Sequence, residues 1–523
     1  MTATATDAPT LDANLASRIL AWTAQTPDTT ALVIPREWDE SGVTAADEVT
    51  YGDLGRHVAE FWDGLGRHGI GKGDRVVVLF PVGVDLFALA LATLARGATL
   101  TFVDMSMRPR HIRQALGTAR PTAIVTVARV LRLAKLVPEV RSIPLKVCTD
   151  AAVSGAVALD ALRGDPRARI EVTPVRPADE ALVTFTTGST GRPKGADRNH
   201  GVLAGQLDAV MAAFPGGDRD VDLSVQPVGA LADLAVGATC LMAPMDYRDP
   251  ASLDPAVTLA LMAKWDVTRL GAAPHFLDTI EQHARESGAR VASLRHLFTG
   301  GAPVSAQLCE RLLDTFPGAS GVVAYGATEA EPIAVSGFAD IAAAHVDGYH
   351  VGCPVAGIRL VVVDLPDGIE ELGPEGFDPY RVAAGAVGEI VVSGPQVISR
   401  YISGDAAARA TKVVDGEGAI WHRTGDLGRL HADGSLELVG RIADVVHAGT
   451  EDVMPYPVER EIGSDPHIAW VALVCHSAAP DAEVLVVPAE GATPAAARAG
   501  AEAVLMRRGL EGIPVVAVEA LAL

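Results

Sequence analysis

Residues 184–195 read TFTTGSTGRPKG and begin at the end of an apolar run, 181–185, that predicts a buried strand. After Phe185 the segment sets four hydroxyl side chains among three glycines and adds a lysine: Thr186, Thr187, Gly188, Ser189, Thr190, Gly191, Lys194 and Gly195. Glycines allow backbone N–H groups to turn inward as a nest for an anion, while hydroxyl and ammonium groups supply further donors. The spacing G-x-x-x-x-G-K-[ST] of a P-loop is absent. The segment therefore predicts a strand followed by a different kind of phosphate-binding loop. The alternative is a polar turn between two strands.

Three further motifs supply the other groups that a nucleotide site needs. Residues 325–331 read YGATEAE and offer an aromatic face for a base, a hydroxyl for phosphate and carboxylates for Mg²⁺. Residues 421–426 read WHRTGD, and residues 440–444 read GRIAD. Asp426 can accept hydrogen bonds from two ribose hydroxyls, and Arg441 is available for phosphate. Together the motifs predict a nucleotide-binding site.

With these motifs the chain resembles the adenylate-forming superfamily of acyl-CoA synthetases, luciferases and nonribosomal adenylation domains. The resemblance extends from VTYGDL at 49–54 to PYPVE at 455–459 and so covers most of the chain. It implies an enzyme that uses ATP and Mg²⁺ to activate a small carboxylic acid as an acyl adenylate.

The resemblance also implies roles for individual residues. It places the β- and γ-phosphates of ATP on Thr186, Thr187, Gly188, Ser189, Thr190, Gly191 and Lys194, and the adenosine beside Gly301, Ala302, Pro303, Tyr325 and Gly326. Thr328 would contact the α-phosphate, and Glu329 would bind the magnesium ion. Asp426 would bind the ribose with Arg441 beside it, and Asp444 would be the hinge between two domains. The catalytic residues would be Lys194, Thr328, Glu329 and Arg441.

Length and pattern predict an α/β protein of two domains. A chain of 523 residues exceeds one ordinary domain. Strand and helix patterns alternate from residue 50 to about residue 330, which predicts doubly wound sheets with helices on both faces. Residues 357–391 read as short strands with turns, typical of a small barrel or antiparallel sheet. We expect a large N-terminal domain at 1–440 and a small, mobile α+β domain at 441–523.

Composition and hydropathy argue against nucleic acid as a partner, against secretion and against a membrane span. The formal net charge of −22 argues against nucleic acid, since a phosphate backbone needs a basic face. The first ten residues lack the pattern of a signal peptide, so the cytoplasm is the expected location. The apolar stretch 76–103 contains Asp85 and Arg96, and it is read as strand 76–80, helix 84–96 and strand 99–103 rather than as a membrane span.

Four segments resemble the olefin β-lactone synthetases within this superfamily: FVDMSM at 102–107, QPVGALADLAVG at 226–237, YGATEAEP at 325–332 and KVVDGEGAIWHR at 412–423. Those enzymes adenylate a 3-hydroxy acid, whose own hydroxyl then displaces AMP and closes a four-membered lactone. The acid pocket is expected to draw on Ala230, Leu231, Ala232, His275, Phe276 and Gly326. A core or capping role for His275 is the alternative to a catalytic one.

One departure from the superfamily keeps other functions open. Its members usually carry a lysine near the C-terminus that stabilises charge during adenylation, but this chain has no lysine after Lys412. Arg507 and Arg508 lie on an earlier predicted helix and are poor substitutes. The alternatives are a ligase that uses CoA or an acyl carrier protein as partner, a ligase that releases a free acyl adenylate, and a catalytically impaired nucleotide- or acyl-binding homologue.

Overall fold

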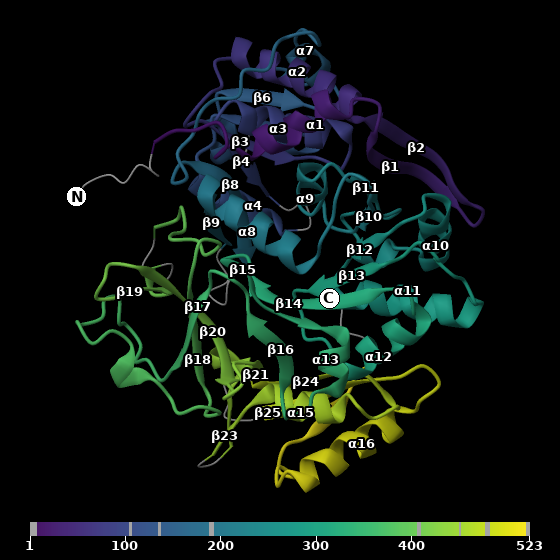
Figure 1. Cartoon of the computed structure of the whole chain (residues 1–523), viewed down its shortest axis with the longest axis vertical. Coiled ribbons are helices and arrows are strands. Elements are labelled where there is room, and N and C mark those ends of the chain that lie inside the picture. Colours follow the sequence, from purple (N-terminus) through teal and green to yellow (C-terminus); the bar gives the residue numbers. More distant parts are fainter. Residues whose placement is uncertain are drawn as a thin grey trace.

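The chain was analysed as a computed structural model, which describes residues 8–103, 107–133, 137–187, 193–404, 409–448, 451–475 and 482–518. Two large sheets lie one above the other in Figure 1, and a small C-terminal unit lies beside the lower one. The sequence-based prediction of an α/β fold is confirmed.

The first sheet contains the predicted strand of the phosphate loop. Its order is β7 (Val157–Ala158), β6 (Leu145–Cys148), β5 (Ala123–Thr126), β3 (Arg75–Leu79), β4 (Thr99–Phe102), β8 (Glu180–Thr187) and β9 (Pro193–Asn199). All neighbours are parallel except β8 and β9, which are antiparallel. The strand predicted at 181–185 is therefore present, but it continues to Thr187 and pairs with a second strand that contains Lys194.

The second sheet is parallel in one half and antiparallel in the other. Its order is β17 (Arg359–Val363), β18 (Gly388–Ser393), β20 (Ile420–Leu430), β21 (Leu436–Arg441), β16 (Tyr349–Pro354), β15 (Ala330–Gly337), β14 (Ser320–Ala327), β13 (His296–Gly300), β12 (Arg269–Gly271), β10 (Val221–Ser224), β11 (Thr239–Met242), β1 (Thr30–Asp39) and β2 (Gly42–Thr50), with β19 (Lys412–Val414) paired to β20. Strands from β14 to β1 run parallel, and those from β14 to β17 alternate in direction. The antiparallel strands predicted at 357–391 are present as β17 and β18, but the antiparallel half already begins at β15, before that segment.

Helices cover both faces of each parallel region. Alternate residues of a strand point to opposite faces, so Val76 and Val78 pack in the core shared by the two sheets, whereas Val77 and Leu79 pack under other helices. The shared core contains residues of α1 (Leu15–Gln25), α2 (Tyr51–Arg67), α3 (Val84–Ala95), α8 (His200–Ala213) and α9 (Ala230–Ala235). The outer faces carry α4 (Pro109–Ala119), α5 (Ala128–Leu133) and α6 (Pro138–Arg141) on the first sheet, and α10 (Pro255–Lys264), α11 (Pro274–Ser287), α12 (Ala306–Thr315) and α13 (Phe338–Ala343) on the second. Shorter elements are α7 (Leu159–Leu162), η2 (Pro250–Ser252) and η3 (Asp378–Tyr380).

The apolar stretch 76–103 forms the predicted strand–helix–strand unit. Every residue of α3 except Asp85 is buried, because the helix is enclosed between the two sheets. Within the described residues, no helix combines the length and the apolar character needed to cross a membrane.

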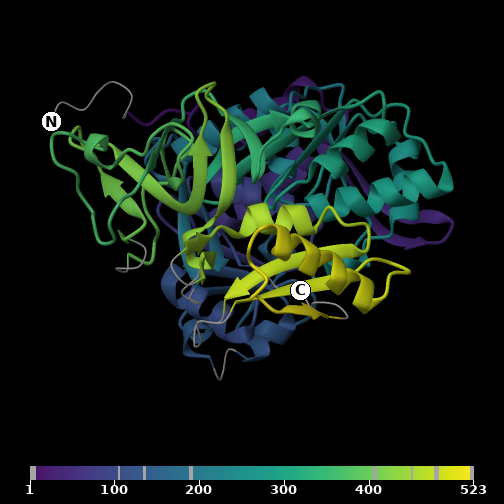
Figure 2. The same cartoon turned by 90° about the horizontal axis from the view of Figure 1, so that it is seen from below.

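The chain after β21 has a core of its own. It comprises η4 (Ile442–Asp444), β22 (Val446–Ala448), β23 (Glu451–Val453), α15 (Pro455–Ile462), β24 (Ile468–Cys475), β25 (Ala482–Pro488), α16 (Pro494–Arg507) and β26 (Val515–Ala517). Figure 2 shows this unit, in yellow, against one side of the molecule. Arg508 forms an ion pair of 2.7 Å with Asp347, and Arg460 donates to the carbonyl of Val346, so polar contacts join the unit to the segment before β16.

Candidate active site

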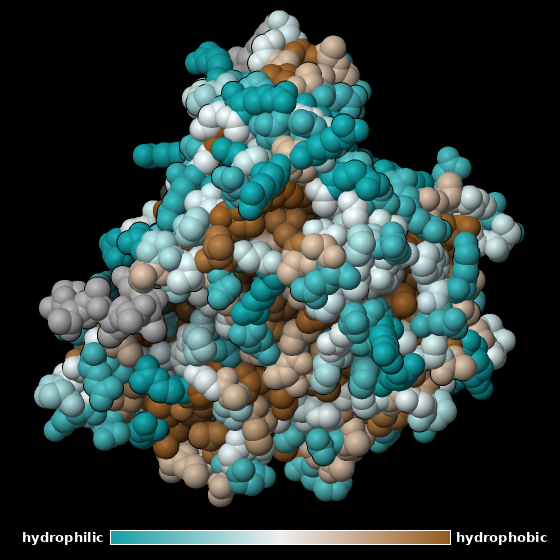
Figure 3. All heavy atoms as spheres, turned by 45° about the horizontal axis from the view of Figure 1, so that its top comes forward, coloured by the Kyte–Doolittle hydropathy of each residue, from teal (hydrophilic) through white to brown (hydrophobic). Residues whose placement is uncertain are grey.

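A cavity of about 690 Å³ opens between the parallel and antiparallel halves of the second sheet and reaches β8 and β9 of the first. In Figure 3, hydrophobic side chains gather around a hollow near the middle of the visible face. The predicted site residues that line the cavity are Ala232, Gly301, Ala302, Pro303, Tyr325, Gly326, Thr328, Asp426 and Arg441. Segments separated by more than 200 residues in the sequence therefore form one wall.

The β14–β15 hairpin brings the YGATEAE motif to the cavity. Tyr325 ends the buried part of β14, and Thr328 lies in the turn between the strands. An added Cβ on Gly326 would lie 2.7 Å from the carbonyl oxygen of Ala330 and 3.2 Å from the Cα of Glu331, so the tight hairpin requires glycine there. A Cβ on Gly300 would lie 2.5 Å from the carbonyl oxygen of Ala324, which explains the close approach of β13 to β14 beside Tyr325. The hairpin thus exposes a ring, a hydroxyl and backbone to the same space.

The pair predicted to hold the ribose is assembled across two adjacent strands. Asp426 on β20 lies opposite Arg441 on β21 in the antiparallel register. Its Oδ1 accepts from Arg441 Nε at 2.9 Å, and its Oδ2 accepts from the Tyr325 hydroxyl at 2.7 Å. Burial raises the pKa of Asp426, and the hydrogen bonds from Tyr325 and Arg441 oppose that shift. Because each carboxylate oxygen can accept a second bond, the pair is compatible with ribose hydroxyls as further donors.

The phosphate-loop prediction is only partly described by the structure. Gly188, Ser189, Thr190 and Gly191 lie outside the described residues, whereas the backbones of Thr186 and Thr187 belong to β8. Lys194 was expected in a polar loop, but it lies on β9 opposite Thr186 and its side chain is buried. Antiparallel pairing of β8 with β9 holds the lysine at the base of the loop.

Sequence analysis missed two residues, Tyr401 and Lys412, and the ring of Tyr401 lies close to both Lys412 and Lys194. The Nζ atoms of Lys194 and Lys412 lie 5.7 Å and 5.6 Å from the centroid of the Tyr401 ring, a range at which cations are attracted to an aromatic face. The Tyr401 hydroxyl donates to Glu329 Oε1 at 2.6 Å. Burial lowers the pKa of Lys412 to about 7, although the carboxylate of Glu329 acts in the opposite direction. Nothing in the sequence singled out Tyr401, and Lys412 was notable only as the last lysine of the chain.

Glu329 has the chemistry expected of a magnesium ligand. Hard cations prefer oxygen, and Mg²⁺ is commonly bound by one or two carboxylates together with substrate phosphates. Glu329 Oε1 accepts a hydrogen bond from Tyr401, and this bond restrains the orientation of the whole carboxylate. Among the residues that the structure describes, no three His, Cys, Asp or Glu side chains gather in a way that could hold a metal ion by themselves. A site at Glu329 would therefore depend on phosphate oxygens from the nucleotide.

The residues expected in the acid pocket are only partly brought to the cavity. Ala232 lines it, whereas Ala230 and Leu231 are buried in the shared core because successive helical residues face different directions. His275 is exposed on α11 and Phe276 packs toward the second core, while the preceding Ala272 and Ala273 line the cavity. One side of the cavity, here called the apolar side, is instead lined by Val210, Met211, Phe214, Val228 and Phe298.

Asp444 lies in the exposed turn η4, directly after β21. This turn connects the second sheet to the C-terminal unit.

Comparisons with known proteins show the family to which the chain belongs. The family model described as AMP-binding enzyme matches residues 20–402. The olefin β-lactone synthetase of Xanthomonas campestris pv. campestris is 30% identical over 484 residues, which cover 88% of this chain and 84% of that protein. The feruloyl-CoA synthase of an Amycolatopsis species is 30% identical over 455 residues, which cover 85% of this chain and 84% of that protein.

Solved structures show the same fold. The amide bond synthetase McbA from Marinactinospora thermotolerans has a TM-score of 0.78 and 23% identity, and the match covers 98% of this chain and 96% of McbA. The ATP-bound MatB from Rhodopseudomonas palustris has a TM-score of 0.77 and 23% identity, and the match covers 97% of this chain and 95% of MatB.

Proposed function

Since the chain belongs to the AMP-binding enzyme family and is an AMP-forming ligase that activates a carboxylic acid as an acyl adenylate, we propose that its acid is a 3-hydroxy acid, which it closes to a β-lactone. In the first half-reaction the carboxylate attacks the α-phosphorus of ATP and pyrophosphate leaves. In the second, the 3-hydroxyl oxygen attacks the acyl carbonyl carbon, the bond to AMP breaks, and the hydroxyl proton is released. The products are a lactone, AMP and pyrophosphate.

The observation that carries this proposal is the similarity to olefin β-lactone synthetases along most of both chains. The cavity supports it, because an apolar side next to the Tyr325 side allows an alkyl chain and an adenylate to lie in one continuous space. A hydroxyl held beside an activated carbonyl reacts as an intramolecular group, so no second substrate has to enter.

The nucleotide roles follow from the same proposal. Asp426 and Arg441 would hold the ribose, Tyr325 with residues 301–303 would hold adenine, and Thr328 would meet the α-phosphate. Glu329 would hold Mg²⁺, which when bound neutralises phosphate charge as pyrophosphate leaves. The C-terminal unit would reorient about Asp444 between the half-reactions, and this role of the exposed η4 turn stays a prediction.

A CoA ligase is the second candidate. The feruloyl-CoA synthase match has the same identity as the match to the β-lactone synthetases. In that case the adenylate would be attacked by a thiol from outside the cavity rather than by the acid's own hydroxyl.

Product analysis separates the two candidates. With ATP, Mg²⁺ and a 3-hydroxy acid, we expect AMP, pyrophosphate and a β-lactone without CoA, all measured by mass spectrometry. The matching 3-deoxy acid lacks the internal nucleophile, so it should stop as bound acyl adenylate. Turnover of the 3-deoxy acid only when CoA is supplied, at the rate of the hydroxy acid, would identify a CoA ligase instead.

Asp426→Ala is expected to weaken ATP binding by about 10- to 100-fold, because charge-assisted hydrogen bonds to buried groups are worth roughly 1.5–3 kcal/mol. The change also leaves the Tyr325 hydroxyl without its partner. Isothermal calorimetry with ATP measures the effect. Asp415→Ala is a matched control, because this carboxylate also accepts a hydrogen bond from a side chain of β20, that of Trp421, but does not line the cavity. Equal ATP affinity for Asp426→Ala and the parent would remove Asp426 from the nucleotide site.

A further inference from the structure

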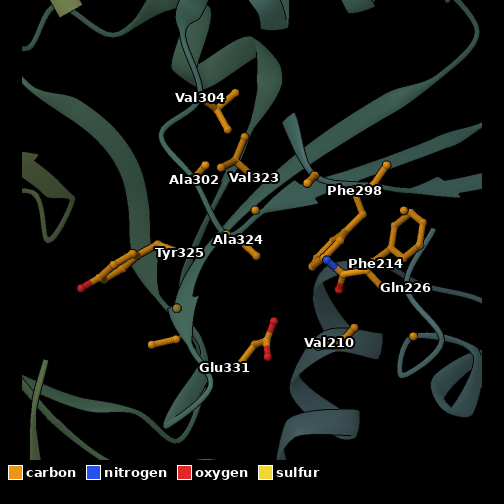
Figure 4. Close-up of a pocket in the computed structure, with 18 of the residues that line it drawn as sticks. Val210, Phe214, Gln226, Phe298, Ala302, Val304, Val323, Ala324, Tyr325 and Glu331 are labelled. Carbon is orange, nitrogen blue, oxygen red and sulfur yellow. The ribbon is translucent and has the colours of Figure 1, made fainter. Parts of the chain in front are cut away.

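Glu331 stands at the border between the two sides of the cavity. In Figure 4 its carboxylate points into the space that separates Tyr325 from Phe298, Phe214 and Gln226. The Tyr325 side contains the residues proposed to bind the nucleotide, and the phenylalanines belong to the apolar side. An acyl adenylate bound with its AMP on the Tyr325 side and its acyl chain on the apolar side would have its carbonyl carbon at that border, because this carbon joins the two parts.

Contacts within the β14–β15 hairpin place Glu331 close to the side of the cavity that is proposed to hold the nucleotide. Its Cα would lie 3.2 Å from an added Cβ on Gly326. Arg198 Nε donates to the Thr328 carbonyl at 3.3 Å, and its NH2 lies 3.7 Å from Glu331 Oε2. A single guanidinium group therefore separates the carboxylate of Glu331 from the backbone of Thr328.

Glu331 differs from the other carboxylates that line the cavity in the part of the chain described. Asp222 and Asp233 both lie 3.3 Å from Arg269, and Asp426 accepts from Tyr325 and Arg441. The 3.7 Å between Arg198 and Glu331 exceeds an ordinary hydrogen bond. About half of the Glu331 side-chain surface is exposed, and that exposure faces the cavity it lines. The carboxylate is thus accessible to a bound substrate.

The position of Glu331 suits a proton acceptor. A general base must lie within hydrogen-bond reach of the proton that it removes, and the exposed carboxylate faces the space that a substrate's hydroxyl group would enter. The guanidinium of the buried Arg198, 3.7 Å away, holds a positive charge beside this carboxylate.

We propose that Glu331 is the general base that accepts the proton of the substrate's 3-hydroxyl group as its oxygen attacks the adenylate carbonyl carbon. This inference rests on the proposed lactone-forming function. The O–H bond breaks and its proton passes to the Glu331 carboxylate, a C–O bond forms to close the ring, and the bond between the acyl carbon and AMP breaks. AMP leaves as a phosphate anion, and Glu331 later releases the proton to solvent.

The test compares the two half-reactions in full-length variants. Adenylation is followed as ATP–pyrophosphate exchange with a 3-deoxy acid, and ring closure as β-lactone formed in a single turnover with the 3-hydroxy acid. Glu331→Gln should slow ring closure by about 100-fold, since positioned bases contribute 10²- to 10⁴-fold. Exchange should fall at least tenfold less than ring closure. Bound acyl adenylate should then accumulate and be detectable by mass spectrometry after acid quenching.

Two further variants sharpen the comparison. Glu331→Asp keeps a carboxylate on a shorter side chain and should recover part of the ring-closure rate. Glu375→Gln removes an exposed carboxylate that does not line the cavity, and both rates should equal those of the parent.

Each other outcome has a distinct meaning. Lactone formation by Glu331→Gln at the parental rate overturns the role of Glu331 and leaves the proposed function intact. Equal losses in exchange and ring closure also overturn it, because they indicate a role in binding or folding. Absence of lactone with the parent protein overturns the proposed function itself, and the inference falls with it.

Discussion

Lys194→Met is expected to slow ATP–pyrophosphate exchange by about 100- to 1,000-fold, the usual effect of removing one preorganised donor from a developing charge. Lys194 lies on β9 at the base of the phosphate loop, with its ammonium group 5.7 Å from the Tyr401 ring centroid. Tyr401 donates to Glu329, so one tyrosine contacts both the residue proposed for phosphate and the residue proposed for magnesium. Losing the cation should raise the barrier to pyrophosphate departure.

Methionine is the appropriate replacement because Lys194 is only 9% exposed. It preserves most of the packing of the alkyl stem, whereas alanine would also open a cavity. Lys264→Met is the control, since this lysine ends α10 on the exposed outer side of the second sheet. Exchange by Lys194→Met within threefold of the parent, with an unchanged unfolding midpoint, would show that this lysine does not act on the phosphates.

Arg269→Met is expected to cost about 3–5 kcal/mol of unfolding free energy, the usual cost of leaving a buried charge without its partner. The Arg269 side chain is fully buried, and its NH1 lies 3.3 Å from Asp222 and from Asp233. It also donates to the carbonyl of Phe214 at 3.1 Å, and its guanidinium carbon lies 4.0 Å from that ring centroid. Burial and the neighbouring Asp233 raise the pKa of Asp222, so the arginine mainly neutralises the second carboxylate.

Urea unfolding measures this loss, and its pH dependence has a definite sign. Without Arg269 the pKa of Asp233 rises further above its unfolded value, so the folded variant binds more protons than the unfolded chain. The loss of unfolding free energy relative to the parent should therefore grow as pH rises above the pKa that Asp233 has in the unfolded chain. The same loss should shrink toward acid pH. Arg18→Met removes an exposed pair with Asp208 and should cost less than about 1 kcal/mol. A similarly small cost for Arg269→Met at neutral pH would show that both carboxyls are already uncharged.

Local sequence patterns predicted most of the elements that surround the site. The apolar run before the glycine-rich segment formed β8, and the stretch 76–103 formed β3, α3 and β4. These predictions succeed because side-chain periodicity and turn residues act over a few positions along the chain. The grouping of Tyr325, Asp426 and Arg441 was expected from the resemblance and is present in the cavity.

Contacts between distant segments were not available from such patterns. The ring of Tyr401 lies close to both Lys194 and Lys412, although more than 200 residues separate it from Lys194, and no spacing rule links these positions. Ala230 and Leu231 were expected in the acid pocket, yet the rotation of α9 buries them and leaves Ala232 at the wall. Lys194 was placed in a loop because its strand forms through pairing with β8 and with the segment around Tyr401, and neither pairing leaves a pattern in the residues next to the lysine.

The sequence by itself thus determined the alternation of strands and helices, the change to antiparallel strands and the set of nucleotide-binding motifs. The tertiary structure alone decided which partner each charged side chain has. Arg269 lies beside Asp222 and Asp233, Lys412 lies near the ring of Tyr401, and Glu331 lies beside Arg198 at the border of the cavity. The physical reason is that secondary structure depends on hydrogen bonds and side-chain patterns within short segments. Burial, pKa and side-chain direction depend instead on the packing of elements far apart in the chain.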